Sequence, residues 1–221
     1  MNSYSKFGPE LQTLLHLSKA PVAIAFAADL SDLDKSTDTV PSSCAFWTKA
    51  LDRTFYTTPE QHQSCSIGAV THGYRAAKDT LGGCGCADVD LLESVGWVGD
   101  EDIKGLPAIP QDKQRKIAYG PLAQAPFTPD VVLMFLNAGQ AMLVAESTKS
   151  RKVLSKPTCQ ALPEAYKGNF VVSLGCTASR LRAGYDDNEM VVAIPGKELE
   201  GFVQRLRVST AADTKVAGAV G

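Results

Sequence analysis

The stretch Cys65-Ser-Ile-Gly-Ala-Val-Thr-His-Gly73-Tyr74 aligns without gaps with Cys176-Thr-Ala-Ser-Arg-Leu-Arg-Ala-Gly184-Tyr185. A second cysteine precedes each copy, in Pro41-Ser-Ser-Cys44 and in Pro157-Thr-Cys159. The two cysteines are 21 positions apart in the first copy and 17 positions apart in the second. This pattern predicts an internal duplication, over roughly residues 20–80 and 130–200, with one site built across a pseudo-twofold axis. The alternative is a chance match in a chain with 18 glycines, whose cysteines only fill the core.

The cysteines predict a metal or cluster site. Four converging thiolates are the ligands that zinc or an iron–sulfur cluster needs. Two more cysteines lie in Leu81-Gly-Gly-Cys84-Gly-Cys86, where glycines allow a bulky ligand to approach the backbone. There is no Cys-x-x-Cys spacing, so the motif is weaker than that of a ferredoxin or a zinc ribbon. The candidate ligands are Cys44, Cys65, Cys159 and Cys176, with Cys84 and Cys86 as additional or replacement ligands.

Composition narrows the class of protein. The 221 residues are 44% hydrophobic and 21% charged, which is ordinary for a globular domain. A net charge of −2 gives no reason to expect a nucleic acid or an anionic membrane as a partner. The amino end has no signal-peptide pattern, and the longest apolar run, residues 20–28, is too short to span a bilayer. We therefore expect a cytoplasmic protein whose thiols stay reduced, which favours metal binding or catalysis over disulfides.

Strands and helices mix along the chain without a strict βαβ rhythm. Apolar runs predict strands at 22–26, 54–58, 131–136, 169–174 and 189–194, and a strand or hairpin arm beginning at 117. Helical periodicity predicts helices at 8–19, 44–52, 88–95, 139–147, 159–166 and 198–206, and after Cys65 and Cys176. Ser42 or Ser43 and Thr158 are the expected helix caps, which would place Cys44 and Cys159 in first turns with a lowered thiol pKa. The fold class is α+β, or α/β, in a single domain over 1–208 with a mixed sheet, followed by a disordered tail over 209–221.

A set of short motifs resembles one family. They are Pro21-Val-Ala-Ile, Cys44 before an alanine-containing helix, Cys65-Ser-Ile-Gly68, Asp130-Val-Val with Gln140-Ala-Met, Gly175-Cys176-x-x-Ser-Arg180, and Asp187-Asn-Glu-Met190 with Ile194-Pro195. Together they resemble the DUF169, or ArCR, proteins of archaea and bacteria over roughly residues 10–208. The resemblance implies that family's fold and little about function. The apparent home of the family among anaerobes favours iron–sulfur over zinc, and Cys84-Gly-Cys86 has no place in its pattern.

Three functions fit the cysteines. The first is an iron–sulfur protein with a 4Fe-4S or larger cluster, in electron transfer or in sulfur or metal handling, with a redox partner protein or small molecule and a possible homodimer. The second is a metal-free thiol redox enzyme that uses Cys44 or Cys159 as nucleophile, with Cys84 or Cys86 resolving it. The third is a module stabilised by zinc or binding a small anion through Arg180, Arg182 and Tyr185. His62 and His72 are predicted to lie on the surface, and the sequence leaves open whether the protein is an enzyme.

Overall fold

The sheet organises the molecule. A computed structural model describes residues 3–27, 30, 32–80, 87–112, 114–148 and 150–220. Within these residues, seven strands form one sheet in the order β2-β3-β1-β4-β7-β6-β5. Only β5 and β6 pair in parallel, so the sheet is mixed and the predicted α+β class is confirmed. The strands are β1 Val22–Ala27, β2 Phe55–Thr57, β3 Lys116–Pro121, β4 Val131–Leu136, β5 Lys152–Leu154, β6 Val171–Ser173 and β7 Met190–Pro195.

The two sides of the sheet repeat one arrangement. Both β2-β3-β1 and β6-β7-β4 are antiparallel triplets, and β1 and β4 meet antiparallel at the centre. Their registers match, because Val22 at the start of β1 lies opposite Pro121 and Val131 at the start of β4 lies opposite Pro195. Duplication of an ancestral half stays a prediction. Matching strand registers in the two halves are expected if such a duplication took place.

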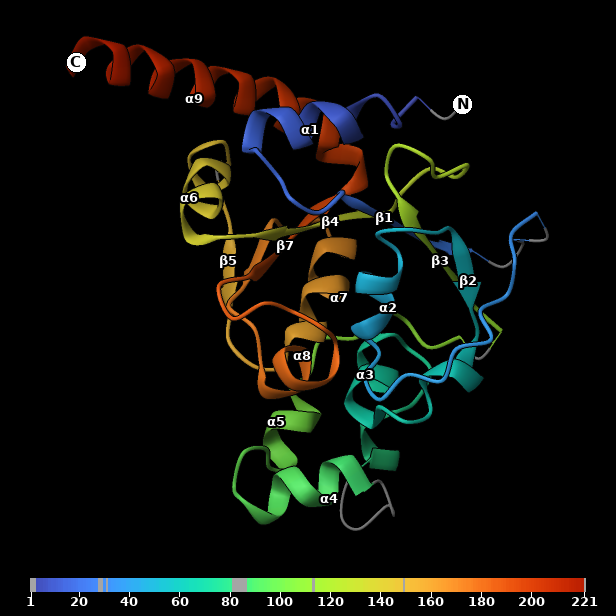
Figure 1. The fold of residues 1–221 in the computed structure, drawn as a ribbon. Helices are drawn as coiled ribbons and strands as arrows, with labels where there is room; N and C mark the ends of the chain where they lie inside the picture. The colour runs from blue at the N-terminus through green and yellow to red at the C-terminus, as the bar shows by residue number, and fades with distance from the viewer. Residues whose placement is uncertain are drawn as a thin grey trace.

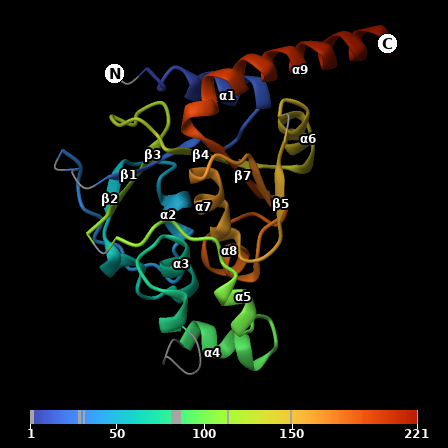
Figure 2. The ribbon, with the colours of Figure 1, turned by 180° about the vertical axis from the view of Figure 1, so that it is seen from behind.

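Helices cover both faces of the sheet. In Figures 1 and 2, α1, α6 and α9 lie on one side, while α2 and α7 lie on the other, with α3 and α8 beyond them and α4 and α5 farthest from the sheet. The α-helices are α1 Phe7–Leu15, α2 Ala45–Lys49, α3 Ser66–Thr71, α4 Ala87–Ser94, α5 Asp100–Lys104, α6 Ala138–Glu146, α7 Ala161–Tyr166, α8 Thr177–Arg182 and α9 Leu199–Val220. Short 3-10 helices are η1 Pro59–His62, η2 Ala77–Thr80, η3 Thr158–Gln160 and η4 Gly196–Glu198.

The side-chain alternation of the strands builds a core on each face. In β4, Val131, Leu133 and Phe135 face the core under α2 and α7, whereas Val132 and Met134 face the core under α1, α6 and α9. Fully burying one such side chain stabilises the fold by about 1.5–3 kcal/mol. The side chains of α2 and α7 therefore have a rigid floor, and the cysteines lie at the starts of helices above that floor.

Several boundaries differ from the sequence prediction. The last helix was predicted to end at Leu206 before a disordered tail, but α9 continues to Val220. Its later residues are mostly exposed, and Ala211, Ala212 and Ala217 favour helix without core contacts. The sequence analysis also missed β5, a three-residue edge strand, and α5. No helix in the described part of the chain is both long and apolar enough to span a membrane.

Candidate functional site

Four cysteines from distant parts of the chain line one pocket. Cys44, Cys65 and Cys176 are the residues that begin α2, α3 and α8, and Cys159 lies in η3 directly before α7. All four are free thiols, and all but Cys65 are buried. The side chains leave about 40 Å³ of space among themselves. The structure thus brings together the four thiols that the repeated motif predicted, while Cys84 and Cys86 lie outside the described residues.

The backbone positions Cys159 and Cys176, the two pocket cysteines of the second half, in different ways. Gly175, with φ of +96°, turns the chain out of β6 so that Cys176 can begin α8. Cys159 is buried, and its segment follows Pro157. The two Gly-Tyr pairs of the repeat are also alike in structure, because Gly73 and Gly184 have positive φ values of 78° and 74° and both tyrosines are buried.

Three groups show that the thiols influence one another. Burial raises the pKa of the Cys44 thiol far above its usual value, and the charges of Cys65 and Cys176 raise it further. Burial likewise raises the pKa of Cys159, followed by the charge of Cys65. The Tyr185 hydroxyl is buried against Cys44 without ordinary hydrogen-bond geometry, and burial and the thiol charges raise its pKa. The predicted lowering of the Cys44 and Cys159 pKa values by helix starts is therefore wrong, because desolvation outweighs the helix dipole.

Cys176 is the exception among the buried thiols. Burial acts to raise its pKa, but hydrogen bonds from Thr158 and Ser179 outweigh burial and hold the pKa below the usual thiol value. Ser179 Oγ accepts a hydrogen bond from the Cys176 backbone N at 2.9 Å and lies 3.1 Å from Thr158 Oγ1. A hydroxyl cluster therefore stabilises a thiolate at this one position.

We expect Cys176 to be alkylated faster than Cys44 and Cys159 in metal-free protein near neutral pH. Thr158→Val removes one stabilising hydroxyl, so the pKa of Cys176 should rise and its alkylation profile should move to higher pH. Iodoacetamide labelling followed by peptide mass spectrometry measures this for each cysteine. Thr48→Val, which removes a hydroxyl that bonds only backbone carbonyls, is the control. Equal profiles for the wild-type protein and Thr158→Val would contradict the assignment.

In the first half, Gly68 takes the place that Ser179 has in the second, three residues after the helix-start cysteine. A Cβ at Gly68 would lie 2.4 Å from Ser43 Oγ and 2.7 Å from Cys65 Sγ. The space is used by Ser43, whose hydroxyl lies 2.9 Å from His62 Nδ1. Ser43 and Thr158 therefore hold the site together from the residue before each upstream cysteine and do not cap the helices. Likewise, Ser42 Oγ lies 3.0 Å from Cys44 Sγ.

His62 and His72 are buried next to the thiol pocket, so their predicted surface positions are wrong. Their rings lie 5.0 Å apart. His62 Nε2 lies 2.8 Å from Thr57 Oγ1. His72 Nδ1 lies 2.6 Å from the Gly68 carbonyl oxygen and must donate to it, so Nε2 is the unprotonated nitrogen, and among the described residues it has no hydrogen-bond partner. Burial lowers the pKa of His72 to about 4 and the pKa of His62 well below its usual value.

The segment with α4 and α5 covers the thiols. Asp88 and Leu92 of α4, with Trp97, form part of the pocket wall. Asp88 accepts hydrogen bonds from the Ser66 backbone N at 2.9 Å and from Ser66 Oγ at 3.0 Å, which ties α4 to the start of α3. Arg180 and Arg182 are both exposed, and Arg182 also lines the pocket. Of the three residues predicted to bind a small anion, Arg182 and Tyr185 therefore lie at the thiols.

Sequence reasoning missed Ser43, Thr158, Ser179 and the cover residue Trp97 as parts of the site. A hydroxyl residue immediately before Cys44 and before Cys159 repeats in both halves, and this was the available signal for Ser43 and Thr158. Trp97 comes from a segment outside the repeat and carries no comparable signal. Within the described parts of the chain, no three His, Cys, Asp or Glu side chains are already arranged to hold a metal ion.

The comparisons with known proteins identify the family. The model of DUF169, described as uncharacterised ArCR, matches residues 10–205. The chain belongs to this family. It is also 26% identical to an uncharacterized protein of Methanocaldococcus jannaschii, over 93% of this chain and 94% of that protein. No solved structure matches the chain. The DUF169 match covers all four pocket cysteines and confirms the family resemblance found in the sequence.

Proposed function

We propose that this DUF169 protein binds an iron–sulfur cluster through Cys44, Cys65, Cys159 and Cys176. The observation that supports the proposal is the convergence of four reduced thiols, from four separate helix starts, on one largely apolar pocket. Its role would be electron transfer or the handling of sulfur or metal. A redox partner protein or small molecule would then exchange electrons or sulfur with the site.

The chemistry of the residues fits a thiolate-bound group. Cysteine ligands must lose their protons, and buried thiols with raised pKa values lose them readily only to a metal. Tyr185, whose buried hydroxyl lies against Cys44, could donate a hydrogen bond to a ligated sulfur. When bound, such a cluster would supply a centre that accepts and donates electrons.

The size of the pocket makes the proposal specific. The 40 Å³ among the thiols is close to the volume of about one water in the liquid. A cubane therefore requires the cover of Leu92 and Trp97 to move outward, whereas a single zinc ion requires only that the thiols close in. Cluster binding should consequently expose the cover segment to protease, and zinc binding should not.

A metal-free thiol redox enzyme is the second candidate. The lowered pKa of Cys176 favours it, because a thiolate is the nucleophilic form of cysteine. The raised pKa values of Cys44 and Cys159 disfavour attack by either of them as the resolving thiol, which leaves Cys65 as the pocket cysteine for that role.

The deciding experiment is a visible spectrum with iron, sulfide and zinc analysis of protein purified without oxygen. We expect a brown protein with iron and sulfide in comparable amounts. Cys44→Ser and Cys176→Ser should each lose most of the iron, and the Cys84→Ser/Cys86→Ser double variant tests whether those cysteines are ligands. Colourless protein with zinc would favour the structural site instead. Protein without metal, even after anaerobic reconstitution, would exclude the cluster and leave the thiol enzyme.

A further inference from the structure

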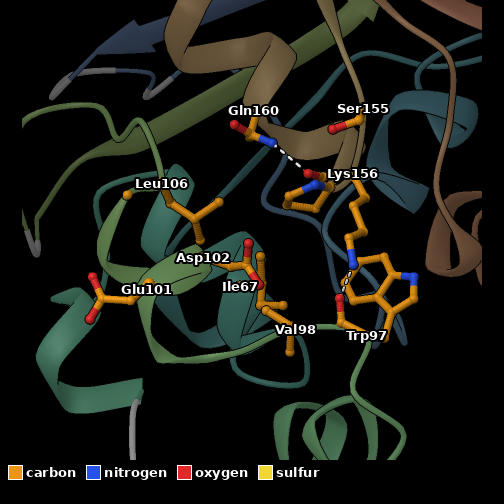
Figure 3. Close-up of a pocket in the computed structure, with 11 residues that line it drawn as sticks. Ile67, Trp97, Val98, Glu101, Asp102, Leu106, Ser155, Lys156 and Gln160 are labelled. Atoms are coloured by element: carbon orange, nitrogen blue, oxygen red, sulfur yellow. Dashed lines mark hydrogen bonds between the residues drawn. The ribbon is translucent and has the colours of Figure 1, made fainter.

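A second pocket of about 310 Å³ lies beside the thiols (Figure 3). Ile67, Trp97 and Pro157 line both pockets, so a single layer of side chains separates them. Its volume is at the lower end of the range of about 300–1,000 Å³ for small-molecule sites. The pocket lies between the α5 region on one side and the segment from Ser155 to Gln160 on the other.

One wall of this pocket carries a positioned ammonium group. Lys156 Nζ donates a hydrogen bond to the Trp97 carbonyl oxygen and lies 4.5 Å from the centre of the Trp97 ring. Gln160 Nε2 donates to the Lys156 carbonyl oxygen at 2.8 Å, which braces the backbone of the lysine. Figure 3 shows the lysine side chain lying along the indole. Contact with an aromatic ring and a carbonyl already restricts the Lys156 side chain. A ligand that binds it would therefore cause a smaller loss of side-chain conformational entropy than with a freely mobile lysine.

The opposite wall carries a carboxylate. Asp102 lines the pocket, and its Oδ2 accepts a hydrogen bond from the Gly99 backbone N at 2.9 Å, which fixes the side chain. In Figure 3, Asp102 lies in the middle of the pocket beside Ile67 and Val98, whereas Glu101 points away from them. The apolar side chains of Ile67, Val98 and Leu106 line the same pocket as this carboxylate and the Lys156 ammonium.

We propose that this pocket binds a free α-amino acid with an apolar or sulfur-containing side chain. Its ammonium would pair with Asp102, its carboxylate would pair with Lys156, and its side chain would lie on the apolar surface of the pocket. Asp102 and Lys156 are both exposed, so a ligand with only one charged group loses the contact at the other end without leaving a buried charge. The proposal depends on this pocket alone and does not require a cluster at the thiols.

Calorimetric titration of the full-length, metal-free protein tests the proposal, with L-leucine as the probe. Isoamylamine lacks the carboxylate of leucine, and isocaproate lacks its ammonium. We expect saturable leucine binding and about fivefold weaker binding of each analogue, the upper range for one exposed charge pair. Asp102→Asn keeps an oxygen for Gly99 and should weaken leucine and isoamylamine but not isocaproate. Lys156→Gln should weaken leucine and isocaproate but not isoamylamine.

Asp100→Asn is the matched control, since it removes the same charge from the same helix at a position that does not line the pocket. It should leave leucine affinity unchanged. Trp97 is one of two tryptophans, so Trp97→Phe should remove any fluorescence change on binding. The absence of saturable leucine binding overturns the proposal, and so does an analogue that binds as tightly as leucine, or an equal loss in Asp100→Asn and Asp102→Asn. Iron analysis of the same variants shows whether the proposed cluster is affected, so the test of leucine binding and the test of the cluster can be judged separately.

Discussion

Gly68→Ala is expected to remove most of the iron of the proposed cluster, although it changes no cysteine. The new Cβ would lie 2.7 Å from Cys65 Sγ and 2.4 Å from Ser43 Oγ, both closer than real contacts allow. Ser43 cannot move freely because it is bonded to His62 at 2.9 Å, so Cys65 must rotate away from the pocket. Overpacking of this kind costs about 1–3 kcal/mol, and the higher helix propensity of alanine recovers about 1 kcal/mol of it.

Iron content, the visible spectrum and urea unfolding measure this result. Gly139→Ala in α6 is the matched control, because its Cβ would meet only Asn137 Oδ1 at 3.5 Å, an ordinary contact. That control should keep its iron. In metal-free Gly68→Ala, Cys65 should also become more accessible to alkylation, which reports the displacement even if no cluster is present. A Gly68→Ala protein with full iron and unchanged Cys65 alkylation would show that Cys65 is not confined as the structure indicates.

The convergence of the thiols could be predicted from the sequence because its signal is repetitive. Cys65 and Cys176 stand at the same point of a ten-residue match, and each has an upstream cysteine after a proline. Equal positions in two halves related by a twofold axis lie at equal distances from it, so cysteines close to such an axis come together, and the matching registers of β1 with β3 and of β4 with β7 are what the predicted duplication would leave. The strands were predictable for a simpler reason, since the apolar run of β4 is buried on both faces.

The electrostatics of the thiols could not be read in the same way. A cysteine at a helix start favours a low pKa only where water or a donor reaches it, and burial decides the result for Cys44 and Cys159. The low pKa of Cys176 depends on Thr158, which is far from it in sequence and adjacent in space. Burial and contacts between distant segments depend on the whole fold. A helix-start rule applied to single residues takes no account of them.

The same argument applies to the histidines. His62 and His72 lie in short segments without periodicity, η1 and the end of α3, and their sequence neighbours give no sign of burial. What buries them is the pairing of these segments under α2, with Phe46 5.0 Å from the His62 ring. A buried pair of histidines is hard to recognise from the sequence, but it makes the stability of the folded protein depend strongly on pH.

Acidification is therefore expected to destabilise the protein well before its carboxylates are protonated. Buried His72 is neutral when folded, with a pKa of about 4, whereas an unfolded histidine titrates near 6.5. Above about pH 6.5 neither state binds the proton and stability is complete. Below it the unfolded state takes up the proton, and stability falls until the pH reaches the folded pKa, a loss of about 3 kcal/mol from His72 alone. His62, whose pKa is lowered further, adds to the loss.

Urea unfolding at pH 7.5 and at pH 4.5 measures the effect, because pH 7.5 lies above the window set by these pKa values and pH 4.5 lies near its lower end. His72→Gln keeps a donor for the Gly68 carbonyl and should be less stable at pH 7.5, yet it should lose about 2.5 kcal/mol less than the wild-type protein between pH 7.5 and pH 4.5. His16→Gln, at an exposed position, is the control and should lose as much as the wild-type protein. Equal losses in all three proteins would mean that the buried histidines open to solvent in the folded state.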